Sequence, residues 1–331
     1  MTKVAINGLG RIGRAALKII LETPDLDLVA VNDLVSTDNL IFMLKYDTAY
    51  GRYEKVLQEH EGHFDVDGKI LQVFHKKDPL ELPWKDLDVD LVFECTGVFT
   101  RREDLIKHIQ AGAKHVILSA PSKSEDIPTI VHGVNTPKKD TRIIISCASC
   151  TTNCITPVVE VMGRRIGIQK ALMTTIHAYT STQGIVDGPS KKFRRGRAGA
   201  ANFVPTSTGA AVATTKALPQ YKGKFDGAAV RAPILVGSIA DMVFLTKKKT
   251  SIKKVNEVFK QESQTDRYRG ILGVTEEPLV SSDIIKDPHA SIVDLTMTQV
   301  VDGDMVKVMS WYDNEWGYAN QMIREALRML A

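Results

Sequence analysis

The sequence predicts an α/β first domain built on a doubly wound parallel sheet, followed by an α+β domain with a mostly antiparallel sheet. The chain has 331 residues, which is long for a single hydrophobic core. Its first half contains short, nearly continuous apolar runs at residues 4–7, 26–31, 90–94, 115–119 and 142–146. Such runs are typical of strands covered on both faces. An apolar pattern with helical spacing at residues 11–21 separates the first two runs.

The second half of the chain has a different pattern. Beyond about residue 165 the β-rich runs become longer, as at residues 171–176, 291–300 and 305–311. The last two runs meet across Asp302-Gly303, a dipeptide typical of a tight turn between antiparallel strands. Helical spacing is found at residues 252–262 and 318–329. This mixture predicts antiparallel strands accompanied by a few helices.

The composition argues against a nucleic-acid or membrane partner. The formal net charge is only +4, which is too small for a generally basic surface. No stretch approaches the roughly 20 apolar residues that cross a bilayer. The N-terminus leads directly into an apolar run without the layout of a signal peptide, so we expect a cytoplasmic protein. Three of the four cysteines lie within residues 147–154, which indicates a reactive thiol or a metal site rather than disulfides.

A glycine-rich turn follows the first predicted strand. Gly8, Gly10 and Gly13 fit the pattern G-x-G-x-x-G between a predicted strand and a predicted helix. Asp33 follows the second predicted strand, where a carboxylate can accept hydrogen bonds from ribose hydroxyls and repel a 2′-phosphate. The fingerprint therefore predicts a Rossmann-type domain that binds NAD in preference to NADP. A structural glycine turn beside an unrelated aspartate is the alternative.

Cys150 has the sequence context of a nucleophile. It lies between an apolar run that ends at Ile145 and a helical pattern at residues 155–162. A cysteine at a helix N-terminus is stabilised as a thiolate by the helix dipole and by free backbone amides. Cys154 lies one helical turn further along, where we expect a small buried core residue.

Three other interpretations of the cysteines remain open. Cys147, Cys150 and Cys154 could bind a metal or an iron–sulfur cluster together with Cys95, although their spacing is not a standard ligand set. Cys147 and Cys150 could form a thioredoxin-like exchange pair. All could be merely buried, but the hydroxyl-rich residues 149–152 suit an anion pocket better than a dry core.

Four separated motifs resemble those of phosphorylating glyceraldehyde-3-phosphate dehydrogenases. They occupy residues 7–14 (NGLGRIGR), 148–154 (ASCTTNC), 177–180 (HAYT) and 311–318 (WYDNEWGY), in the family's order. In that family a cysteine attacks an aldehyde to give a thiohemiacetal, a hydride passes to NAD, and inorganic phosphate splits the resulting thioester. The resemblance implies NAD-dependent conversion of D-glyceraldehyde 3-phosphate to 1,3-bisphosphoglycerate, as in glycolysis and gluconeogenesis.

The resemblance also implies a domain organisation and an assembly. The NAD-binding domain would comprise residues 1–149 and be completed by a C-terminal helix at residues 315–331. The catalytic domain would comprise residues 150–314. The family forms homotetramers, and we expect the same of this chain.

Site residues follow from the resemblance position by position. Cys150 matches the nucleophile and His177 the base, which would hold the thiolate as an ion pair and then take the hydroxyl proton. Thr180 and Arg231 match residues that hold the phosphate of the substrate. Matches around inorganic phosphate are Ser149, Thr151, Arg195, Thr208 and Gly209. Matches around NAD are Gly8, Gly10, Arg11, Ile12, Gly13, Asp33, Lys77, Thr96, Gly97, Ser119, Asn314 and Tyr318.

One basic run, residues 191–197, could by itself bind nucleic acid. The more common interpretation of such a run is a solvated loop. In the family this segment belongs to a loop that reaches a neighbouring subunit, and Arg195 would be its phosphate ligand.

Erythrose-4-phosphate dehydrogenase is the nearest alternative activity, and a semialdehyde dehydrogenase is a more distant one. The intact Thr180 and Thr208-Gly209 contexts favour glyceraldehyde 3-phosphate.

Some positions depart from the usual family pattern. Cys147 stands where asparagine is common, and Cys95 stands where serine is common. Oxidation could join Cys147 to Cys150 and inactivate the enzyme; Cys147→Ser would then make inactivation by peroxide irreversible by thiols, and unchanged recovery would refute the idea. Residues 232–238 lack the usual threonine and asparagine, which affects the expected fit of the substrate but not the reaction type.

Overall fold

The computed structural model describes residues 1–60, 62–137 and 143–331. These residues divide into two compact units, each described by itself below. The first unit comprises residues 1–130, 136–148 and 322–331, and the second comprises residues 131–135 and 149–321. The domain boundaries expected from the sequence remain a prediction. None of the described helices combines the length and the apolar composition that a membrane-spanning helix requires.

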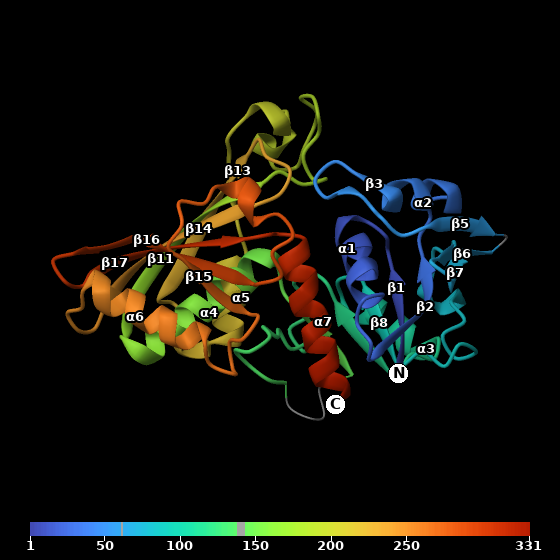
Figure 1. The fold of residues 1–331 in the computed structure, drawn as a ribbon, viewed down its shortest axis with the longest axis horizontal. Coiled ribbons are helices and arrows are strands. Elements are labelled where there is room, and N and C mark those ends of the chain that lie inside the picture. Colours follow the sequence, from blue (N-terminus) through green and yellow to red (C-terminus); the bar gives the residue numbers. More distant parts are fainter. Residues whose placement is uncertain (61, 138–142) are drawn as a thin grey trace. The chain divides into compact units, whose positions relative to one another are not determined.

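The first unit is built on an eight-stranded sheet, which confirms the predicted α/β class (Figure 1). Its strand order is β10-β9-β8-β1-β2-β7-β6-β5, and the pairs from β10 to β7 are parallel. The buried strands coincide with the apolar runs of the sequence: β1 (Thr2–Asn7), β2 (Leu26–Asn32), β8 (Leu91–Glu94), β9 (His115–Leu118) and β10 (Ile144–Ser146). Residue 142, with which the last predicted strand began, lies outside the described residues.

Helices of the first unit connect these strands. The predicted helix after the first strand is α1 (Arg11–Ile20), which contacts β1 and β2, and α3 (Arg102–Gln110) contacts β9. Gly10 occupies the N-cap position of α1, so the first turn of this helix has no capping side chain. The smaller elements are α2 (Thr37–Lys45), β3 (Tyr46–Asp47), β4 (Gly51–Arg52) and η1 (Pro79–Glu81).

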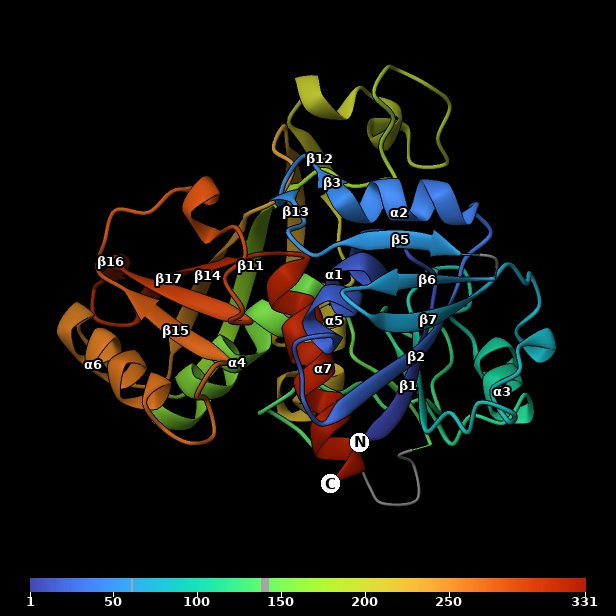
Figure 2. The same ribbon diagram turned by 45° about the vertical axis from the view of Figure 1, so that its right-hand side comes forward.

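An antiparallel extension of this sheet was not predicted from the sequence. β5 (Leu57–His60), β6 (His63–Val66) and β7 (Lys69–Phe74) lie side by side, with α2 against β5 and β6 (Figure 2). β5 is largely exposed, half-buried and buried residues alternate in β6, and exposed and buried residues alternate in the centre of β7. Strands that face solvent on one side lack a continuous apolar run, which is why the pattern of buried parallel strands does not find them.

The second unit contains a seven-stranded sheet of mostly antiparallel pairs, as predicted. Its order is β12-β13-β11-β14-β17-β16-β15. The strands are β11 (Ile168–Ala178), β12 (Val204–Ser207), β13 (Phe225–Ala232), β14 (Ser238–Thr246), β15 (Leu272–Thr275), β16 (Ser291–Val301) and β17 (Met305–Tyr312). The hairpin between β16 and β17 turns at Asp302 and Gly303, both with positive φ, as a tight hairpin requires.

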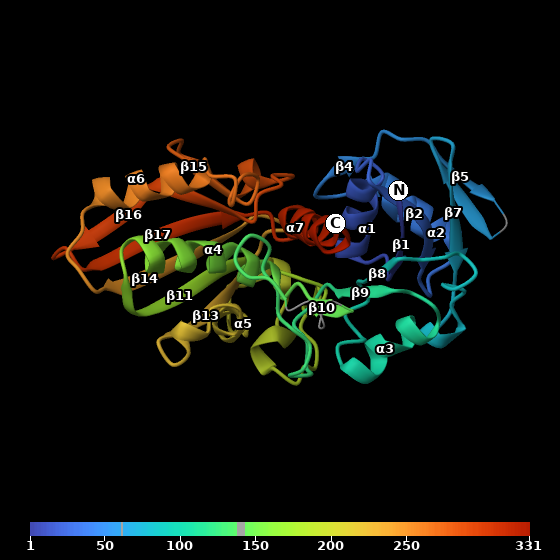
Figure 3. The ribbon, with the colours of Figure 1, turned by 90° about the horizontal axis from the view of Figure 1, so that it is seen from below.

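Helices cover one face of the second sheet. α4 (Cys150–Arg165) contacts β11, β14, β16 and β17, and α6 (Ile252–Ser263) contacts β15 and β16 (Figure 3). α4 begins at Cys150, one turn before the apolar pattern of the sequence. The other helical segments of this unit are α5 (Ala210–Ala217), η3 (Phe193–Gly196), η4 (Gly199–Ala201), η5 (Pro219–Tyr221) and η6 (Ser281–Ile284). The last helix, α7 (Trp316–Leu330), begins in the second unit, and its residues from 322 onward belong to the first.

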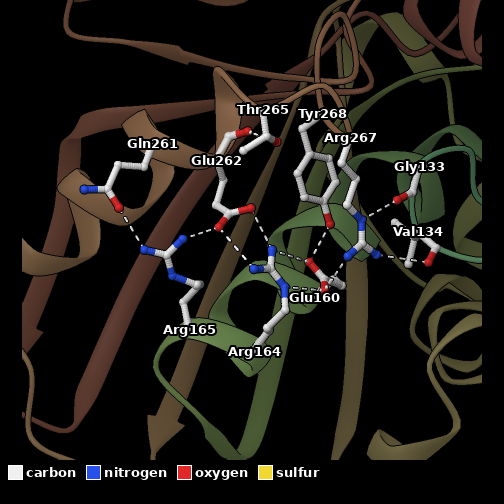
Figure 4. A network of polar contacts seen from close by, with 10 residues as sticks. All are labelled: Gly133, Val134, Glu160, Arg164, Arg165, Gln261, Glu262, Thr265, Arg267 and Tyr268. Atoms are coloured by element: carbon white, nitrogen blue, oxygen red, sulfur yellow. Dashed lines mark hydrogen bonds and ion pairs between the residues drawn. The ribbon is translucent and has the colours of Figure 1, made fainter.

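An ion-pair network fastens the C-terminal end of α4 to its neighbours in the second unit (Figure 4). Arg164 donates to Glu160 in α4 at 2.8 Å and to Glu262 in α6 at 2.6 Å. Arg267 donates to Glu160 at 3.1 Å, and Tyr268 donates to the same carboxylate at 2.5 Å. Hydrogen bonds from Arg164, with burial opposing, hold the pKa of Glu262 below its usual range. Burial raises the pKa of Glu160, but hydrogen bonds from Arg164 and Tyr268 outweigh it and lower the pKa overall.

This network should make the second unit sensitive to acid. A carboxylate whose pKa is lowered by folding stabilises the protein fully above its unfolded pKa, about 4.3, and loses this effect as the pH falls through the folded value. We expect Glu262→Gln to lower stability at neutral pH by about 2–4 kcal/mol, because it removes the charge partner of Arg165 and one of the two charge partners of Arg164. Urea midpoints measured from neutral pH down to about 4 should fall less steeply in the variant than in the wild type. Equal slopes would contradict the assignment.

Candidate active site

The first unit contains a cavity of about 740 Å³ at the carboxyl ends of the parallel strands. This is where open α/β sheets bind ligands, and the volume suits a small molecule. Among its lining residues are five predicted cofactor residues: Gly8, Gly10, Asp33, Lys77 and Thr96. Arg11, Ile12, Gly13, Gly97 and Ser119 belong to the same unit but are not part of the described cavity wall. The sequence reasoning missed other wall residues, including Asn7, Asn32, Lys76, Cys95 and Phe99.

The three glycines of the G-x-G-x-x-G fingerprint differ in the physical reason for having no side chain. Gly8 has φ +93°, and a Cβ there would lie 2.6 Å from the backbone nitrogen of Thr96. A Cβ on Gly13 would lie 1.9 Å from the carbonyl oxygen of Gly8, so the start of α1 packs directly on the preceding turn. A Cβ on Gly10 would meet nothing within 4 Å. This leaves open space at the amide groups of the first helical turn, where an anion binds well.

The carboxylate of Asp33 is hydrogen-bonded to the backbone of the glycine-rich turn. Its Oδ2 accepts a hydrogen bond from the backbone N–H of Leu9 at 2.6 Å, and its Oδ1 accepts one from Val35 at 3.1 Å. Each carboxylate oxygen retains a further lone pair for ribose hydroxyls. Arg11 pairs with Asp47 at 2.5 Å, which directs its guanidinium toward the segment between α2 and β5.

The residues present fit NAD. The uncapped N-terminus of α1 suits the pyrophosphate, the glycines allow its close approach, and Asp33 suits the adenosine ribose. Thr96 and Lys77 add polar groups to the same cavity wall. Asn314 and Tyr318, the remaining predicted cofactor residues, belong to the second unit, where both are buried. Oδ1 of Asn314 accepts a hydrogen bond from the hydroxyl of Ser238 at 2.9 Å, an orienting contact that the sequence reasoning missed.

In the second unit, Cys150 and His177 lie in contact. Cys150 is the first residue of α4, and the hydroxyl of the N-cap residue Ser149 accepts a hydrogen bond from the N–H of Thr152. Sγ of Cys150 lies 3.3 Å from Nε2 of His177, which stands near the end of β11. Nδ1 of His177 lies 2.6 Å from the carbonyl oxygen of Ala178. In the tautomer that carries its proton on Nδ1 and donates it to this oxygen, Nε2 is free to accept a proton from the thiol.

Arg231 adjoins this pair because β11 and β13 are parallel neighbours in which His177 is paired with Arg231. Its Nη1 lies 2.6 Å from Nδ1 of His177 and donates to the carbonyl of Ala178 at 2.9 Å. Its Nε is buried and has no hydrogen-bond partner among the described residues. A half-buried guanidinium with a buried, unsatisfied donor is suited to hold an anion.

The electrostatics of the pair oppose charge separation. Burial, followed by the charge of Arg231, lowers the pKa of His177 to about 3 and so keeps the imidazole neutral. Burial raises the pKa of the Cys150 thiol, while the charge of Arg231 and hydrogen bonds at Thr151 act in the opposite direction. The ion pair expected from the sequence is therefore favoured by the contact and the helix N-terminus but opposed by burial. A neutral imidazole is nevertheless the form that can act as a base.

Alkylation of Cys150 by iodoacetamide should depend on His177. We expect His177→Asn to slow the reaction at neutral pH by about tenfold or more, because it removes the base in contact with the thiol. The rate in the variant should keep rising above about pH 8.5, the usual thiol pKa, because burial raises the pKa of Cys150. His289→Asn, which removes an imidazole paired with Asp287, is the matched control. Equal rates in the two variants would contradict a role for His177.

Four of the seven predicted phosphate residues occupy three further places in the second unit. Thr180 follows β11, and its hydroxyl contacts that of Thr182 at 2.9 Å. Arg195 lies in η3 and donates to Thr206 Oγ1 at 2.9 Å. Thr208 and Gly209 precede α5, with Gly209 at its N-cap position. The charge of Arg195 acts on both His177 and Arg231, so these groups share one electrostatic environment.

Thr151 and Tyr312 form contacts that fix the surroundings of Cys150 and His177. The hydroxyl of Thr151 contacts that of Tyr312 at 2.9 Å, and Tyr312 also contacts Thr175 at 2.8 Å. The Tyr312 ring stands edge-on to His177 with centroids 6.0 Å apart. The sequence reasoning did not single out Tyr312, although it lies inside the 311–318 motif. It also missed Gln183, which is buried and whose amide atoms have no hydrogen-bond partner among the described residues.

The other cysteines differ from Cys150. All four are free. Burial raises the pKa of Cys95 and of Cys154 to about 12, and it raises the pKa of Cys147 strongly. These three therefore remain thiols at neutral pH, and the Cys147–Cys150 redox hypothesis stays a prediction. Across residues 1–60, 62–137 and 143–331, no group of three His, Cys, Asp or Glu side chains is arranged to hold a metal ion.

A dinucleotide-binding unit and a second unit with a cysteine–histidine pair define the class of NAD-dependent dehydrogenases that work through a thiol. The protein-family model described as "Glyceraldehyde 3-phosphate dehydrogenase, NAD binding domain" matches residues 2–102 of the chain. The family model described as "Glyceraldehyde 3-phosphate dehydrogenase, C-terminal domain" matches residues 149–314. The chain therefore belongs to the glyceraldehyde 3-phosphate dehydrogenase family, and it is an NAD-binding oxidoreductase.

Individual relatives agree over nearly the whole chain. The chain is 49% identical over 326 residues to glyceraldehyde-3-phosphate dehydrogenase of Thermotoga maritima, covering 98% of this chain and 97% of that protein. It is 48% identical over 324 residues to glyceraldehyde-3-phosphate dehydrogenase 2 of Streptomyces avermitilis, covering 97% and 96%. It is 46% identical over 330 residues to the enzyme of Clostridium pasteurianum, covering 98% and 97%.

Proposed function

We propose that the protein oxidises D-glyceraldehyde 3-phosphate to 1,3-bisphosphoglycerate with NAD and inorganic phosphate, as an enzyme of cytoplasmic glycolysis or gluconeogenesis. The observation that carries this proposal is the 3.3 Å contact between Cys150 and His177 at the N-terminus of α4, beside Arg231, whose Nε has no hydrogen-bond partner among the described residues. A nucleophile, a base and an anion site are what the oxidation of a phosphorylated aldehyde requires.

The reaction begins at Cys150. As His177 accepts the thiol proton at Nε2, Sγ attacks the aldehyde carbon and a thiohemiacetal forms. The amides at the start of α4 can donate to the developing oxyanion, because they lie next to the nucleophile. His177 then returns this proton to the oxyanion, which gives the hydroxyl of the thiohemiacetal. When bound, NAD would supply the oxidation as a hydride acceptor. The neutral His177 would take the hydroxyl proton again as the thioester forms on Cys150.

The thioester is then split by inorganic phosphate, whose oxygen attacks the acyl carbon and expels the Cys150 thiolate. We assign Thr180 and Arg231 to the phosphate group of the substrate. We assign Ser149, Thr151, Arg195, Thr208 and Gly209 to inorganic phosphate. Gly8, Gly10, Arg11, Ile12, Gly13, Asp33, Lys77, Thr96, Gly97, Ser119, Asn314 and Tyr318 would bind NAD. The open N-terminus of α1 and the orphaned Nε of Arg231 support these assignments most directly.

The decisive experiment measures NADH formation with glyceraldehyde 3-phosphate in the presence and absence of inorganic phosphate. Sustained turnover that requires phosphate supports the proposal. A single stoichiometric burst that phosphate does not extend would show thioester chemistry with another acceptor. If erythrose 4-phosphate were turned over faster than glyceraldehyde 3-phosphate, this four-carbon sugar phosphate would be the preferred substrate.

We also propose that the chain assembles as a homotetramer. The face of the second sheet that the helices leave uncovered carries exposed apolar side chains, among them Leu172 on β11 (65% exposed) and Met305 on β17 (50% exposed). Together with Val243 and Leu245 of β14 they line a concave surface with a cavity of about 930 Å³. Apolar patches of this kind mark protein–protein interfaces.

Leu172→Lys should therefore weaken assembly. A lysine in the centre of an apolar contact must be desolvated without a partner, so we expect a smaller species in sedimentation velocity at the same protein concentration. Ile70→Lys on β7, at an apolar residue 60% exposed in the first unit, is the matched control and should leave the sedimentation coefficient unchanged. An unchanged coefficient for Leu172→Lys would contradict the interface.

A further inference from the structure

Three strands of the first unit end in buried polar side chains beneath the cofactor cavity. Asn7 ends β1, Asn32 ends β2 and Glu94 ends β8, and all three are almost completely buried. The strands are parallel neighbours in the order β8-β1-β2, so the three side chains come from the same edge of the sheet. Neither the proposed reaction nor the fingerprint assigns Glu94 a role.

The two asparagines form a chain of hydrogen bonds with a single direction. The backbone N–H of Lys76 donates to Oδ1 of Asn32 at 2.8 Å. Nδ2 of Asn32 donates to Oδ1 of Asn7 at 2.7 Å, and Nδ2 of Asn7 donates to Oε2 of Glu94 at 2.6 Å. Turning either amide over would place donor against donor, so the chain must end at an acceptor.

A second donor reaches Glu94 from α3. The indole N–H of Trp84 donates to Nδ1 of His108 at 3.0 Å. An indole nitrogen can only donate, so the ring proton of a neutral His108 lies on Nε2. Nε2 is 3.1 Å from Oε2 of Glu94 and donates to it. Both Trp84 and His108 are fully buried, so water does not compete for these bonds.

The other oxygen of Glu94 holds the loop after β8. Oε1 accepts the backbone N–H of Thr96 at 2.8 Å and also the hydroxyl of Thr96. That hydroxyl in turn accepts the N–H of Val98 at 3.1 Å. The backbone of Thr96 is the wall against which Gly8 packs. The carboxylate of Glu94 therefore receives four donors. Through the chain of Asn7 and Asn32 it links the loops after β1, β2, β7 and β8 around the cavity.

We propose that Glu94, oriented by His108 and Trp84, is a positioning residue that sets the affinity for NAD by holding these cavity loops in one arrangement. Only a carboxylate offers acceptors on both oxygens. A glutamine would turn an NH₂ group either toward Asn7 and His108 or toward Thr96, all of which donate. The loops would have to move to relieve this conflict, and part of the binding energy of NAD would be spent on reordering them. This proposal rests on NAD binding at the cavity and concerns no step at Cys150.

The test is calorimetric titration of the full-length protein with NAD. We expect Glu94→Gln to raise the dissociation constant by about tenfold or more, and His108→Leu to do the same. His108→Gln retains one donor and one acceptor and should stay within about threefold of the wild type. Glu262→Gln in the network of Figure 4 is the matched control, because it alters a buried, hydrogen-bonded carboxylate in the second unit. It should lower stability and leave NAD affinity unchanged.

Alkylation of Cys150 in the absence of NAD should proceed at the wild-type rate in Glu94→Gln, which separates positioning from general damage. Wild-type affinity in Glu94→Gln, or equal weakening by Glu262→Gln, would overturn the proposal while leaving the proposed reaction intact. Failure of the wild type to bind NAD would overturn both. If Glu94→Gln does not fold, the contrast between His108→Leu and His108→Gln decides the question in the same way.

Discussion

Replacing Cys150 by serine should lower the rate of NADH formation with glyceraldehyde 3-phosphate by about 10⁴-fold or more, since no other group can form the thioester. A serine hydroxyl is a far weaker nucleophile than a thiol near neutral pH. His177 lies 3.3 Å from the sulfur, but one imidazole with its pKa lowered to about 3 is a weak base for a hydroxyl. Initial rates at saturating NAD and phosphate measure the loss.

Cys154→Ser is the matched control for this experiment. Cys154 lies on the same helix and is completely buried, and its thiol has a pKa of about 12. Its Sγ already contacts the hydroxyl of Ser291 and the carbonyl of Ser310, so a serine there keeps polar neighbours. We expect a small loss of stability and nearly wild-type turnover. A Cys150→Ser enzyme that retained a tenth of the wild-type activity would remove Cys150 from the mechanism.

The second large effect is expected at the fingerprint. Gly13→Ala should destabilise the first unit by about 2–4 kcal/mol in the absence of NAD, because its Cβ would lie 1.9 Å from the carbonyl oxygen of Gly8. Backbone atoms cannot move aside as a flexible side chain can, so the start of α1 must shift away from the turn. NAD binding should be lost with it, because the same turn forms the cavity wall. Thermal unfolding with and without NAD measures both effects.

Gly10→Ala separates packing from ligand approach. Gly10 has a φ of −65°, and a Cβ there would meet nothing within 4 Å, so the variant should unfold at the wild-type temperature without NAD. The added methyl group would nevertheless occupy the open space at the first turn of α1, and we expect NAD to stabilise the variant less than the wild type. Equal destabilisation by Gly10→Ala and Gly13→Ala would contradict this division of roles.

Much of the fold could be predicted because its signals are local. Continuous apolar runs identified β1, β2, β8 and β9, and the Asp302-Gly303 turn identified the hairpin of β16 and β17. The meander of β5, β6 and β7 was missed because β5 is largely exposed and at most every second residue of β6 and β7 is buried. The N-terminus of α4 lies at Cys150, as expected, although the apolar periodicity begins only at residue 155, because the first turn is rich in hydroxyl groups.

The candidate site was predictable only in part. Cys150 and His177 were identified by their motifs, and their contact agrees with that expectation, although their individual roles remain proposals. Tyr312 and Ser238 were missed because their function is to support other side chains, which no spacing in the sequence indicates. The opposition of burial to the ion pair was likewise not predictable, because the pKa values of both groups depend on how many atoms surround them.

By itself, the sequence determined the class of the two sheets and the dinucleotide turn, and it predicted Cys150 as the nucleophile, because these depend on residues close together in the chain. The tertiary structure alone decided which distant groups meet. It paired His177 with Arg231 through the register of β11 and β13, and it directed Trp84, His108 and Asn7 toward Glu94. Hydrogen bonds form over about 3 Å and require a particular direction, so contacts between remote residues arise only when packing brings their strands and helices together.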